Sequence, residues 1–300
     1  MQEKLSKLGP EFSRIILGLW RITDKNLDIK EIENIIKISI DSGIDTFDEA
    51  DIYGDYRSQE LFGEVLKRNK NLRQEIKIIS KGNIQLVSEK RPGNWIKHYD
   101  SSKKYLVDSV NKTLKQLNTD YLDLFLLHRW DPLINPHEIM DTFVALKDAG
   151  KVKHFGVSNF LPEQFNLIDS KLLIPLVTNQ IEVSVLNTEA FENGMLTQCL
   201  HKRIHPLAWS PLGGGELLDP TTKKAITVNE TIEKLTKKYN NVSITQIALA
   251  WLLKHPAKIH PIIGTLNPER IKDAVSALKL DLDLQDWYSI YEASNGNPVP

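Results

Sequence analysis

Short apolar runs alternate with longer amphipathic stretches along the whole chain. The apolar runs have the length of buried strands, and the amphipathic stretches repeat apolar residues at the spacing of one helix face. Strands are expected at 14–20, 44–48, 76–81, 121–128, 154–158, 176–182, 205–210 and 260–264. Helices are expected at 29–41, 102–117, 162–169, 188–201, 228–239 and 243–255, with others that begin near 58, 136, 268 and 284.

Start and stop signals support several of these boundaries. Asp28 and Glu31 have the spacing of a helix capping box, and Gly43 follows the expected end of the same helix. Gly9 and Pro10 predict a small N-terminal turn or hairpin between 4 and 12. The polar stretch 82–101 is too long for a simple connection, and loops of that length are usually functional or disordered.

The repeated strand–helix unit predicts an α/β protein. Eight strands, each followed by a helical segment and without a linker between halves, favour a single (β/α)8 TIM barrel over residues 1–300, with a short N-terminal hairpin and extra helices. An open doubly wound sheet is the alternative. It is disfavoured because no Gly-x-Gly-x-x-Gly motif follows the first strand.

Composition limits the environment and the partners. The 300 residues are 41% hydrophobic and carry a net charge of −1, so the chain can bury a large core and has no basic patch that indicates nucleic acid. Cys199 is the only cysteine, which excludes an intrachain disulfide and fits a reducing compartment. The N-terminus has no signal-peptide pattern, and no apolar run reaches membrane-spanning length. We therefore expect a cytoplasmic protein without a membrane partner.

Polar side chains occur where neighbouring strands end. Asp48 closes the second strand and Tyr53 follows it, Lys81 closes the third strand, and His128 closes the fourth. Active sites of such barrels lie at the carboxyl ends of the strands, so these four side chains are expected to converge.

This set of side chains suggests proton donation to an oxygen that gains negative charge. Asp48 is expected to keep the ammonium group of Lys81 protonated, and that cation is expected to lower the pKa of the Tyr53 phenol. His128 is expected to hold a substrate carbonyl oxygen by a hydrogen bond.

Several motifs occur in order along the chain. They are Phe47-Asp-Glu-Ala-Asp-Ile-Tyr-Gly54, Ile79-Ser-Lys81, Asp123-Leu-Phe-Leu-Leu-His128, Gly150-Lys-Val-Lys-His-Phe-Gly-Val-Ser-Asn159, Asn179-Gln180, Ala208-Trp-Ser-Pro-Leu-Gly213 and Ile262-Ile-Gly-Thr265 with Arg270. Any single motif is weak, whereas their joint order and spacing are specific. By these motifs the chain resembles the aldo-keto reductase superfamily over essentially its whole length, and the segments 8–13 and 209–215 resemble the YdhF type of bacterial oxidoreductase.

The resemblance implies an NADPH-dependent reductase that transfers hydride to a small-molecule aldehyde or ketone. It implies that Tyr53 donates the proton, that Asp48 and Lys81 tune it, and that His128 orients the carbonyl group. No metal is implied.

The resemblance also assigns the cofactor site. Its expected residues near the nicotinamide are Ser158, Asn159 and Gln180 for the carboxamide and Trp209 against the ring. Its expected residues near the phosphates and the adenosine are Ser210, Leu212, Gly213, Gly214, Gly215, Gly264, Thr265 and Arg270, the last of these for the 2′-phosphate of NADPH.

Two departures from the family pattern stand out. Gly264 replaces a common lysine, and Asp273-Ala274 replace a common Glu-Asn pair, which leaves the preference for NADPH over NADH open. Glu49 replaces a small or hydroxyl residue that often follows the aspartate.

Trp20, Trp130 and Trp95 are expected to line the substrate pocket. Aromatic walls favour flat or apolar aldehydes as substrates.

Two other classes of function remain open. One is a regulatory protein that keeps the barrel and the cofactor and signals redox state. The other is a metal-dependent hydrolase that uses His128, His154 and aspartates, although His154 lies at the start of its strand.

Overall fold

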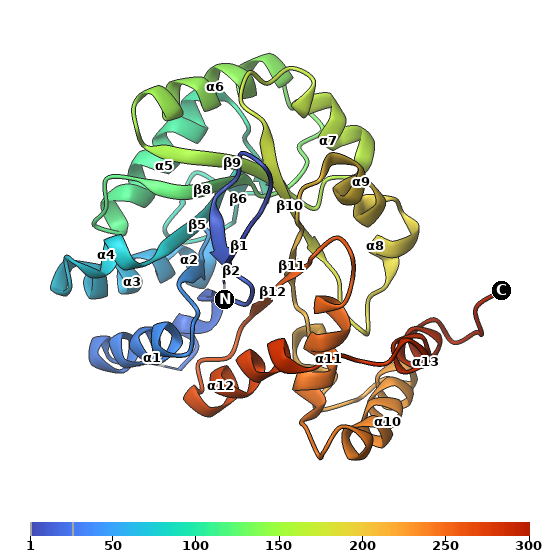
Figure 1. Cartoon of the computed structure of the whole chain (residues 1–300). Coiled ribbons are helices and arrows are strands. Elements are labelled where there is room, and N and C mark those ends of the chain that lie inside the picture. The colour runs from blue at the N-terminus through green and yellow to red at the C-terminus, as the bar shows by residue number, and fades with distance from the viewer. Residues whose placement is uncertain (1, 26) are drawn as a thin grey trace.

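A closed barrel of parallel strands forms the centre of the molecule (Figure 1). The computed structural model describes residues 2–25 and 27–300. Strand neighbours around the barrel follow the chain order, and the last strand pairs with the first, so the barrel prediction is confirmed and the open sheet is wrong. The barrel strands are β3 (Ile16–Gly18), β4 (Thr46–Asp48), β5 (Lys77–Gly82), β8 (Leu122–Leu127), β9 (Val152–Ser158), β10 (Leu176–Glu182), β11 (Leu207–Trp209) and β12 (His260–Ile263).

Helices connect the strands and surround the barrel (Figure 1). The expected capping box is present, since the Asp28 carboxylate accepts from Glu31 N at 2.9 Å and the Glu31 carboxylate accepts from Asp28 N at 2.8 Å. Within the described residues, no helix is both long and apolar enough to cross a membrane. The main helices are α1 (Ile29–Asp41), α3 (Ser58–Arg68), α5 (Lys103–Gln116), α6 (Pro136–Asp148), α7 (Pro162–Asp169), α9 (Met195–Lys202), α10 (Lys223–Lys238), α11 (Ile244–Leu253), α12 (Pro268–Ser276) and α13 (Leu284–Asn295).

The N-terminal hairpin closes one end of the barrel. Its strands β1 (Gln2–Lys4) and β2 (Glu11–Ser13) pair antiparallel, as the turn at Gly9 and Pro10 predicts. Leu5 and Phe12 are fully buried and pack in one cluster with apolar side chains from the barrel strands. A larger cluster fills the layer between the strands and the helices. The interior at the hairpin end is therefore packed, which leaves the opposite end for a site.

Several predicted boundaries are wrong. The expected helix 188–201 is two helices, α8 (Glu189–Glu192) and α9, because Gly194 between them has a left-handed φ of 86°. α10 begins at Lys223 rather than at 228, since the Thr222 hydroxyl caps it by accepting from Ala225 N. The first strand ends before Trp20, which begins the 3-10 helix η1 (Trp20–Thr23).

Other short elements were not expected from the sequence. The polar stretch 82–101 contains β6 (Ile84–Gln85) and β7 (His98–Tyr99), which pair antiparallel. Three brief turns of helix, α4 (Leu72–Glu75), η2 (Gly213–Gly215) and η3 (Ala277–Lys279), are too short to show helical periodicity.

Gly63 allows α3 to touch the end of α5. A Cβ atom at this position would lie 1.8 Å from the Gln116 carbonyl oxygen. We expect Gly63→Ala to destabilise the protein by about 1–3 kcal/mol or more, because backbone must move to relieve the clash. Urea denaturation measures the free energy of unfolding of this variant. The control is Gly93→Ala, because a Cβ atom at Gly93 meets no atom within 4 Å. Equal midpoints for the two variants would contradict it.

Candidate active site

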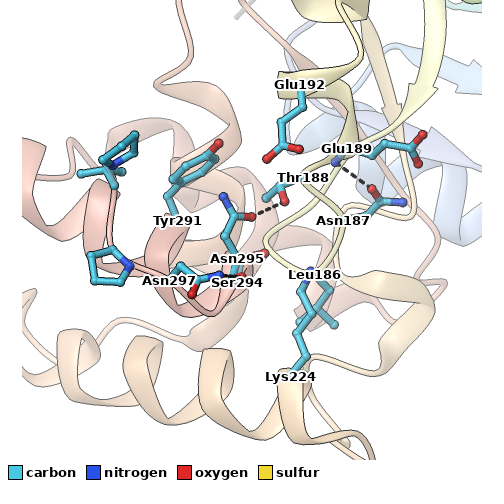
Figure 2. Close-up of a pocket in the computed structure, with 13 residues that line it drawn as sticks. Leu186, Asn187, Thr188, Glu189, Glu192, Lys224, Tyr291, Ser294, Asn295 and Asn297 are labelled. Carbon is cyan, nitrogen blue, oxygen red and sulfur yellow. Dashed lines mark hydrogen bonds between the residues drawn. The ribbon is translucent and has the colours of Figure 1, made fainter.

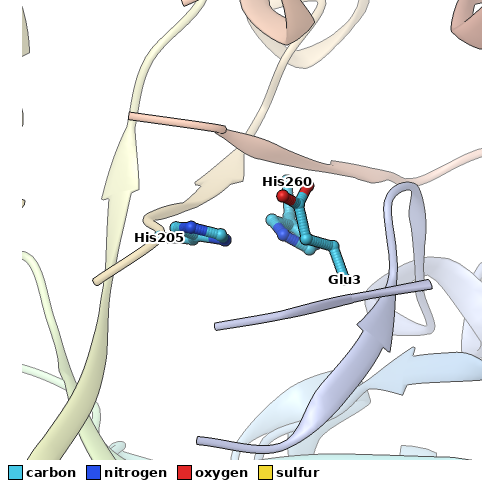
Figure 3. A group of neighbouring side chains, drawn as sticks. All are labelled: Glu3, His205 and His260. Atoms are coloured by element: carbon cyan, nitrogen blue, oxygen red, sulfur yellow. The ribbon is translucent and has the colours of Figure 1, made fainter. Parts of the chain in front are cut away.

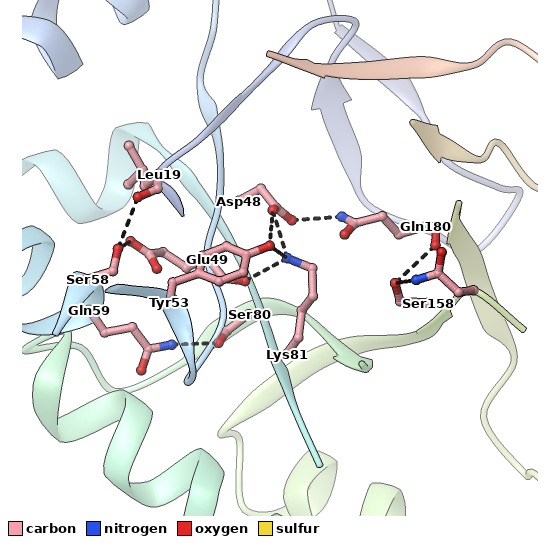
Figure 4. A network of polar contacts seen from close by, with 11 residues as sticks. Leu19, Asp48, Glu49, Tyr53, Ser58, Gln59, Ser80, Lys81, Ser158 and Gln180 are labelled. Carbon is pink, nitrogen blue, oxygen red and sulfur yellow. Dashed lines mark hydrogen bonds and ion pairs between the residues drawn. The ribbon is translucent and has the colours of Figure 1, made fainter. Parts of the chain in front are cut away.

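The side chains at the carboxyl ends of β4 and β5 meet the start of α2 (Tyr53–Tyr56) in one hydrogen-bonded group (Figure 4). Lys81 Nζ donates to Asp48 Oδ2 at 2.7 Å, to Tyr53 Oη at 2.9 Å and to the Glu49 carbonyl oxygen at 2.9 Å. The three donors of the ammonium group are therefore all used.

In this arrangement the phenol proton of Tyr53 points away from Lys81. Because Lys81 donates to the phenol oxygen, the O–H bond of Tyr53 cannot point at Lys81. Its contact to Asp48 Oδ2 is 3.4 Å long. A weakly held O–H group at a strand-end site is a suitable donor to a substrate oxygen.

The expected lowering of the Tyr53 pKa is wrong. Burial raises the pKa of this phenol well above its usual value, and the nearby charges of Asp48 and Glu49 raise it further. The Lys81 ammonium group does not reverse this, since Asp48 pairs with it directly. Tyr53 therefore holds its proton at neutral pH, as a proton donor must.

The Asp48–Lys81 ion pair is buried. Its side chains are 4% and 0% exposed. Burial lowers the pKa of the Lys81 ammonium group, and the charge of Asp48 opposes that shift. The second oxygen of Asp48 accepts from Gln180 Nε2 at 2.8 Å, which links the pair to β10 across the barrel. Each charge therefore has partners that offset its loss of solvation.

His128 lies beside Tyr53 just after β8. The two rings meet edge to face with centroids 6.1 Å apart. Burial lowers the pKa of His128 well below its usual value, and the charges of Lys81 and Arg129 add to the effect. The imidazole is thus neutral at neutral pH, and its Nδ1 is buried without a partner among the described residues. A neutral ring of this kind has one N–H that can donate to a carbonyl oxygen.

The expected nicotinamide residues form a chain of contacts. Ser158 Oγ donates to the Gln180 carbonyl oxygen at 3.1 Å, and Asn159 Nδ2 donates to Ser158 Oγ at 2.8 Å. Trp209 Nε1 donates to Asn159 Oδ1 at 2.9 Å. These bonds fix the half-exposed Trp209 ring relative to the Asp48–Lys81 pair.

Several residues of the glycine-rich segment after β11 have positive φ angles in the left-handed region. Gly213, Gly214 and Gly215 have φ values of 60°, 69° and 113°, and Ser210 shares this region at 50°. Arg21 Nη2 donates to the Gly214 carbonyl oxygen at 2.9 Å, so η1 holds the segment in place. Leu212 packs against the core from the same turn.

The residues expected at the 2′-phosphate lie at the start of α12. Gly264 and Arg270 are exposed, and Thr265 is half-buried. Asn267 caps the helix by accepting from Arg270 N at 3.2 Å, while the arginine side chain makes no ion pair with the residues the structure describes. An exposed guanidinium group at a helix N-terminus fits a phosphate.

The three tryptophans differ in their relation to the site. Trp20 is 59% exposed, and its ring centroid lies 6.4 Å from that of Tyr53. Trp130 packs edge to face on Phe160 at 5.5 Å. Trp95 is 86% exposed in the 82–101 segment. Trp20 is thus the tryptophan that the structure brings closest to the expected donor.

Arg129 was not expected from the sequence. It follows His128, and its guanidinium carbon lies 5.7 Å from the centre of the Trp209 ring. Burial lowers the pKa of Arg129. Its position as the second residue after the end of β8 was the available signal.

A separate cavity of about 580 Å³ contains none of these residues (Figure 2). It lies among the loop after β10, α8, α10 and the C-terminal tail. Thr188 Oγ1 donates to Asn295 Oδ1 at 2.6 Å across one side of it. The cavity has polar walls and is not the aromatic pocket expected for the substrate.

The residues of the metal-hydrolase hypothesis are not brought together. His154 lies on β9 beside Leu124 of β8, a residue that precedes His128 by four positions along the chain. A different group, Glu3, His205 and His260, has ligand atoms within 4.8 Å of one another (Figure 3).

That group lies at the opposite end of the barrel. His205 precedes β11, and His260 is the first residue of β12. Both carboxylate oxygens of Glu3 already pair with cations, Arg14 at 3.1 Å and Lys258 in a shorter contact. A metal ion there would have to displace these charges.

The closed barrel with polar side chains at its strand ends is the architecture of a (β/α)8-barrel protein, and the family comparison defines its class as an oxidoreductase. The model of the aldo/keto reductase family matches residues 14–295, and the chain belongs to this family.

Relatives match almost the full chain. The oxidoreductase YdhF of Escherichia coli is 40% identical over 97% of each chain. A 6-dehydroglucose reductase of Agrobacterium fabrum is 41% identical over 96% of each chain. The crystal structure of the thermostable aldo-keto reductase Tm1743 with the inhibitor epalrestat superposes with a TM-score of 0.82 at 26% identity, covering 98% of this chain and 99% of that one.

Proposed function

We propose that the protein reduces aldehydes or ketones to alcohols with NADPH, and that Tyr53 donates the proton. The observation that carries the proposal is the hydrogen bond from Lys81 Nζ to Tyr53 Oη at 2.9 Å, which leaves the phenol O–H with only a long contact of 3.4 Å to Asp48 Oδ2. A positioned donor of this kind contributes about 10²–10⁴-fold to a reaction rate.

Each residue of the group has a distinct task in this proposal. NADPH, when bound, supplies the hydride. Tyr53 and the neutral His128 hold the carbonyl oxygen of the substrate, and Tyr53 gives its proton to that oxygen as negative charge develops there. Lys81 keeps the phenol oriented and stabilises the phenolate that remains, while Asp48 balances the charge of Lys81.

The strand-end residues fit a nicotinamide. The half-exposed ring of Trp209 offers a flat apolar face, and Asn159 holds it in place. Gln180 uses Nε2 on Asp48 and keeps its side-chain oxygen Oε1 for a carboxamide N–H, while Ser158 and Asn159 offer further polar groups beside it. The left-handed segment Gly213–Gly215, with Ser210 and Leu212, is proposed to bind the pyrophosphate through its backbone.

Arg270 is proposed to bind the 2′-phosphate, near Gly264 and Thr265. We expect Arg270→Ala to raise KM for NADPH by about 10- to 100-fold and to leave KM for NADH nearly unchanged, because a charge-assisted hydrogen bond is worth about 1.5–3 kcal/mol. Steady-state kinetics with both cofactors measures this. Lys272→Ala removes a neighbouring exposed cation of the same helix and serves as the control. Equal changes for the two cofactors in Arg270→Ala would contradict the assignment.

The substrate proposal rests on the surroundings of Tyr53. Trp20 lies closest to the donor, and Trp130 lies two residues after His128, so an apolar wall is proposed beside the carbonyl group. The name of the Agrobacterium relative adds a sugar carbonyl to the candidates. The proposed substrates are therefore aromatic, aliphatic and sugar aldehydes.

Consumption of NADPH with a panel of these aldehydes tests the proposal. Turnover with any of them supports a reductase. Tight binding of NADPH without any reduction would instead favour the regulatory protein that signals redox state, and a search for a protein partner would follow.

A further inference from the structure

A buried carboxyl group lies directly behind the proposed proton donor. Glu49 directly follows Asp48, the last residue of β4, and its side chain reaches the Ser58 hydroxyl at the start of α3. Its backbone N donates to the Ile79 carbonyl oxygen, and its own carbonyl oxygen accepts from Lys81 Nζ. The residue is 0% exposed. Glu49 is therefore part of the cage around Lys81 and has no contact with solvent.

The hydrogen bonds around Glu49 favour a neutral acid. Ser58 Oγ lies 2.7 Å from Glu49 Oε1 and 3.2 Å from the Leu19 carbonyl oxygen (Figure 4). A serine hydroxyl has one proton, so it cannot donate to both oxygens. If Glu49 carries a proton, it donates to Ser58, and Ser58 donates to Leu19. If Glu49 is ionised, one of the two contacts becomes a repulsion between lone pairs.

Solvation favours the same state. Glu49 Oε2 is buried without a hydrogen-bond partner among the described residues, and an ionised carboxylate with one hydrogen bond is costly to bury. Burial raises the pKa of Glu49 to about 8, and the charge of Asp48 contributes. The titratable groups that interact with it are Asp48, Tyr53 and Lys81, and α3 contributes the Ser58 hydroxyl.

We propose that Glu49 is a positioning residue that works as a neutral acid, and that its ionisation at alkaline pH switches off carbonyl reduction. The inference rests on the reductase function proposed above. Reduction builds negative charge on the substrate oxygen beside Tyr53. A second buried carboxylate would oppose that charge and would leave the single ammonium group of Lys81 shared between two anions.

The protonation state is tested without turnover. Infrared difference spectroscopy follows the carbonyl stretch of a protonated carboxylic acid as the pH rises. The native protein is expected to lose one such band with a midpoint of about pH 8, and Glu49→Gln is expected to lack that loss. Asp51 is a second buried acid, but its pKa of about 6 gives an earlier midpoint. The absence of a native midpoint between about pH 7 and 9.5 would overturn the inference.

The effect of Glu49 ionisation on carbonyl reduction is tested by the pH dependence of kcat. Above the pKa of Glu49, native kcat is expected to fall about tenfold for each pH unit. The test depends on this slope and not on the absolute value of kcat. Glu49→Gln cannot ionise and is expected to lose this limb, whereas Glu64→Gln, an exposed glutamate of α3, is expected to keep it. An alkaline limb that persists in Glu49→Gln would overturn the proposed role.

The two measurements also separate the inference from the proposed function. A protein that reduces no carbonyl compound overturns the reductase proposal and the kinetic half of this inference. The infrared midpoint still decides whether Glu49 is a neutral acid.

Discussion

Tyr53→Phe is expected to lower kcat for carbonyl reduction by about 10²–10⁴-fold, while NADPH still binds. The substitution removes only the phenol oxygen, which accepts from Lys81 Nζ and carries the proton proposed for the substrate. The ring remains against Trp20 and His128, so the shape of the site is kept. NADPH consumption with the aldehyde panel measures the rate, and fluorescence titration measures cofactor binding.

The matched control is Tyr121→Phe. Tyr121 precedes β8, and its ring contacts Arg73 and Lys153 rather than the proposed site. This variant loses the same oxygen and is expected to keep native kcat. If Tyr53→Phe retained more than about a tenth of native kcat, another group would have to donate the proton.

Lys81→Met is expected to cost about 3–5 kcal/mol of stability, because it leaves Asp48 as a buried charge without its cation. Gln180 would remain as a neutral donor to Asp48. The same variant is expected to lower carbonyl reduction by about 10²–10³-fold, since Tyr53 loses the group that orients it and stabilises its phenolate. Urea denaturation and the aldehyde assay measure the two effects.

A double-mutant cycle with Asp48→Asn isolates the ion pair. The double variant Asp48→Asn with Lys81→Met has no buried charge at either position, so it is expected to be more stable than the sum of the single changes predicts, by about 0.5–3 kcal/mol. Strict additivity would mean that the two charges do not stabilise each other. Lys37→Met, which breaks an exposed pair with Glu33, is expected to change stability by less than about 1 kcal/mol.

Local sequence patterns were sufficient for most of the fold. The run 122–127 is a strand because it is almost entirely apolar and bounded by turns, and the capping box of Asp28 and Glu31 marks a helix start without any tertiary contact. The prediction failed where one residue changes the backbone, as at Gly194, or where strands are two residues long, as in β6. Neither feature gives a periodic signal.

The candidate site could be predicted in part for a similar reason. Asp48, Lys81 and His128 end neighbouring parallel strands, so barrel topology alone places them at one end. Their hydrogen-bond partners come from distant segments, and Gln180 is 132 residues from Asp48 in sequence. No local pattern predicts that contact.

The sequence by itself determined the barrel, the family motifs and the residue types at the strand ends, because these depend on periodicity and order along the chain. Only the tertiary structure decided the protonation of the site. The pKa of Tyr53 is raised rather than lowered because burial and Asp48 outweigh the cation, and Glu49 has a pKa of about 8 because folding removes it from water. Solvation and the distances between charges exist only after the chain has folded.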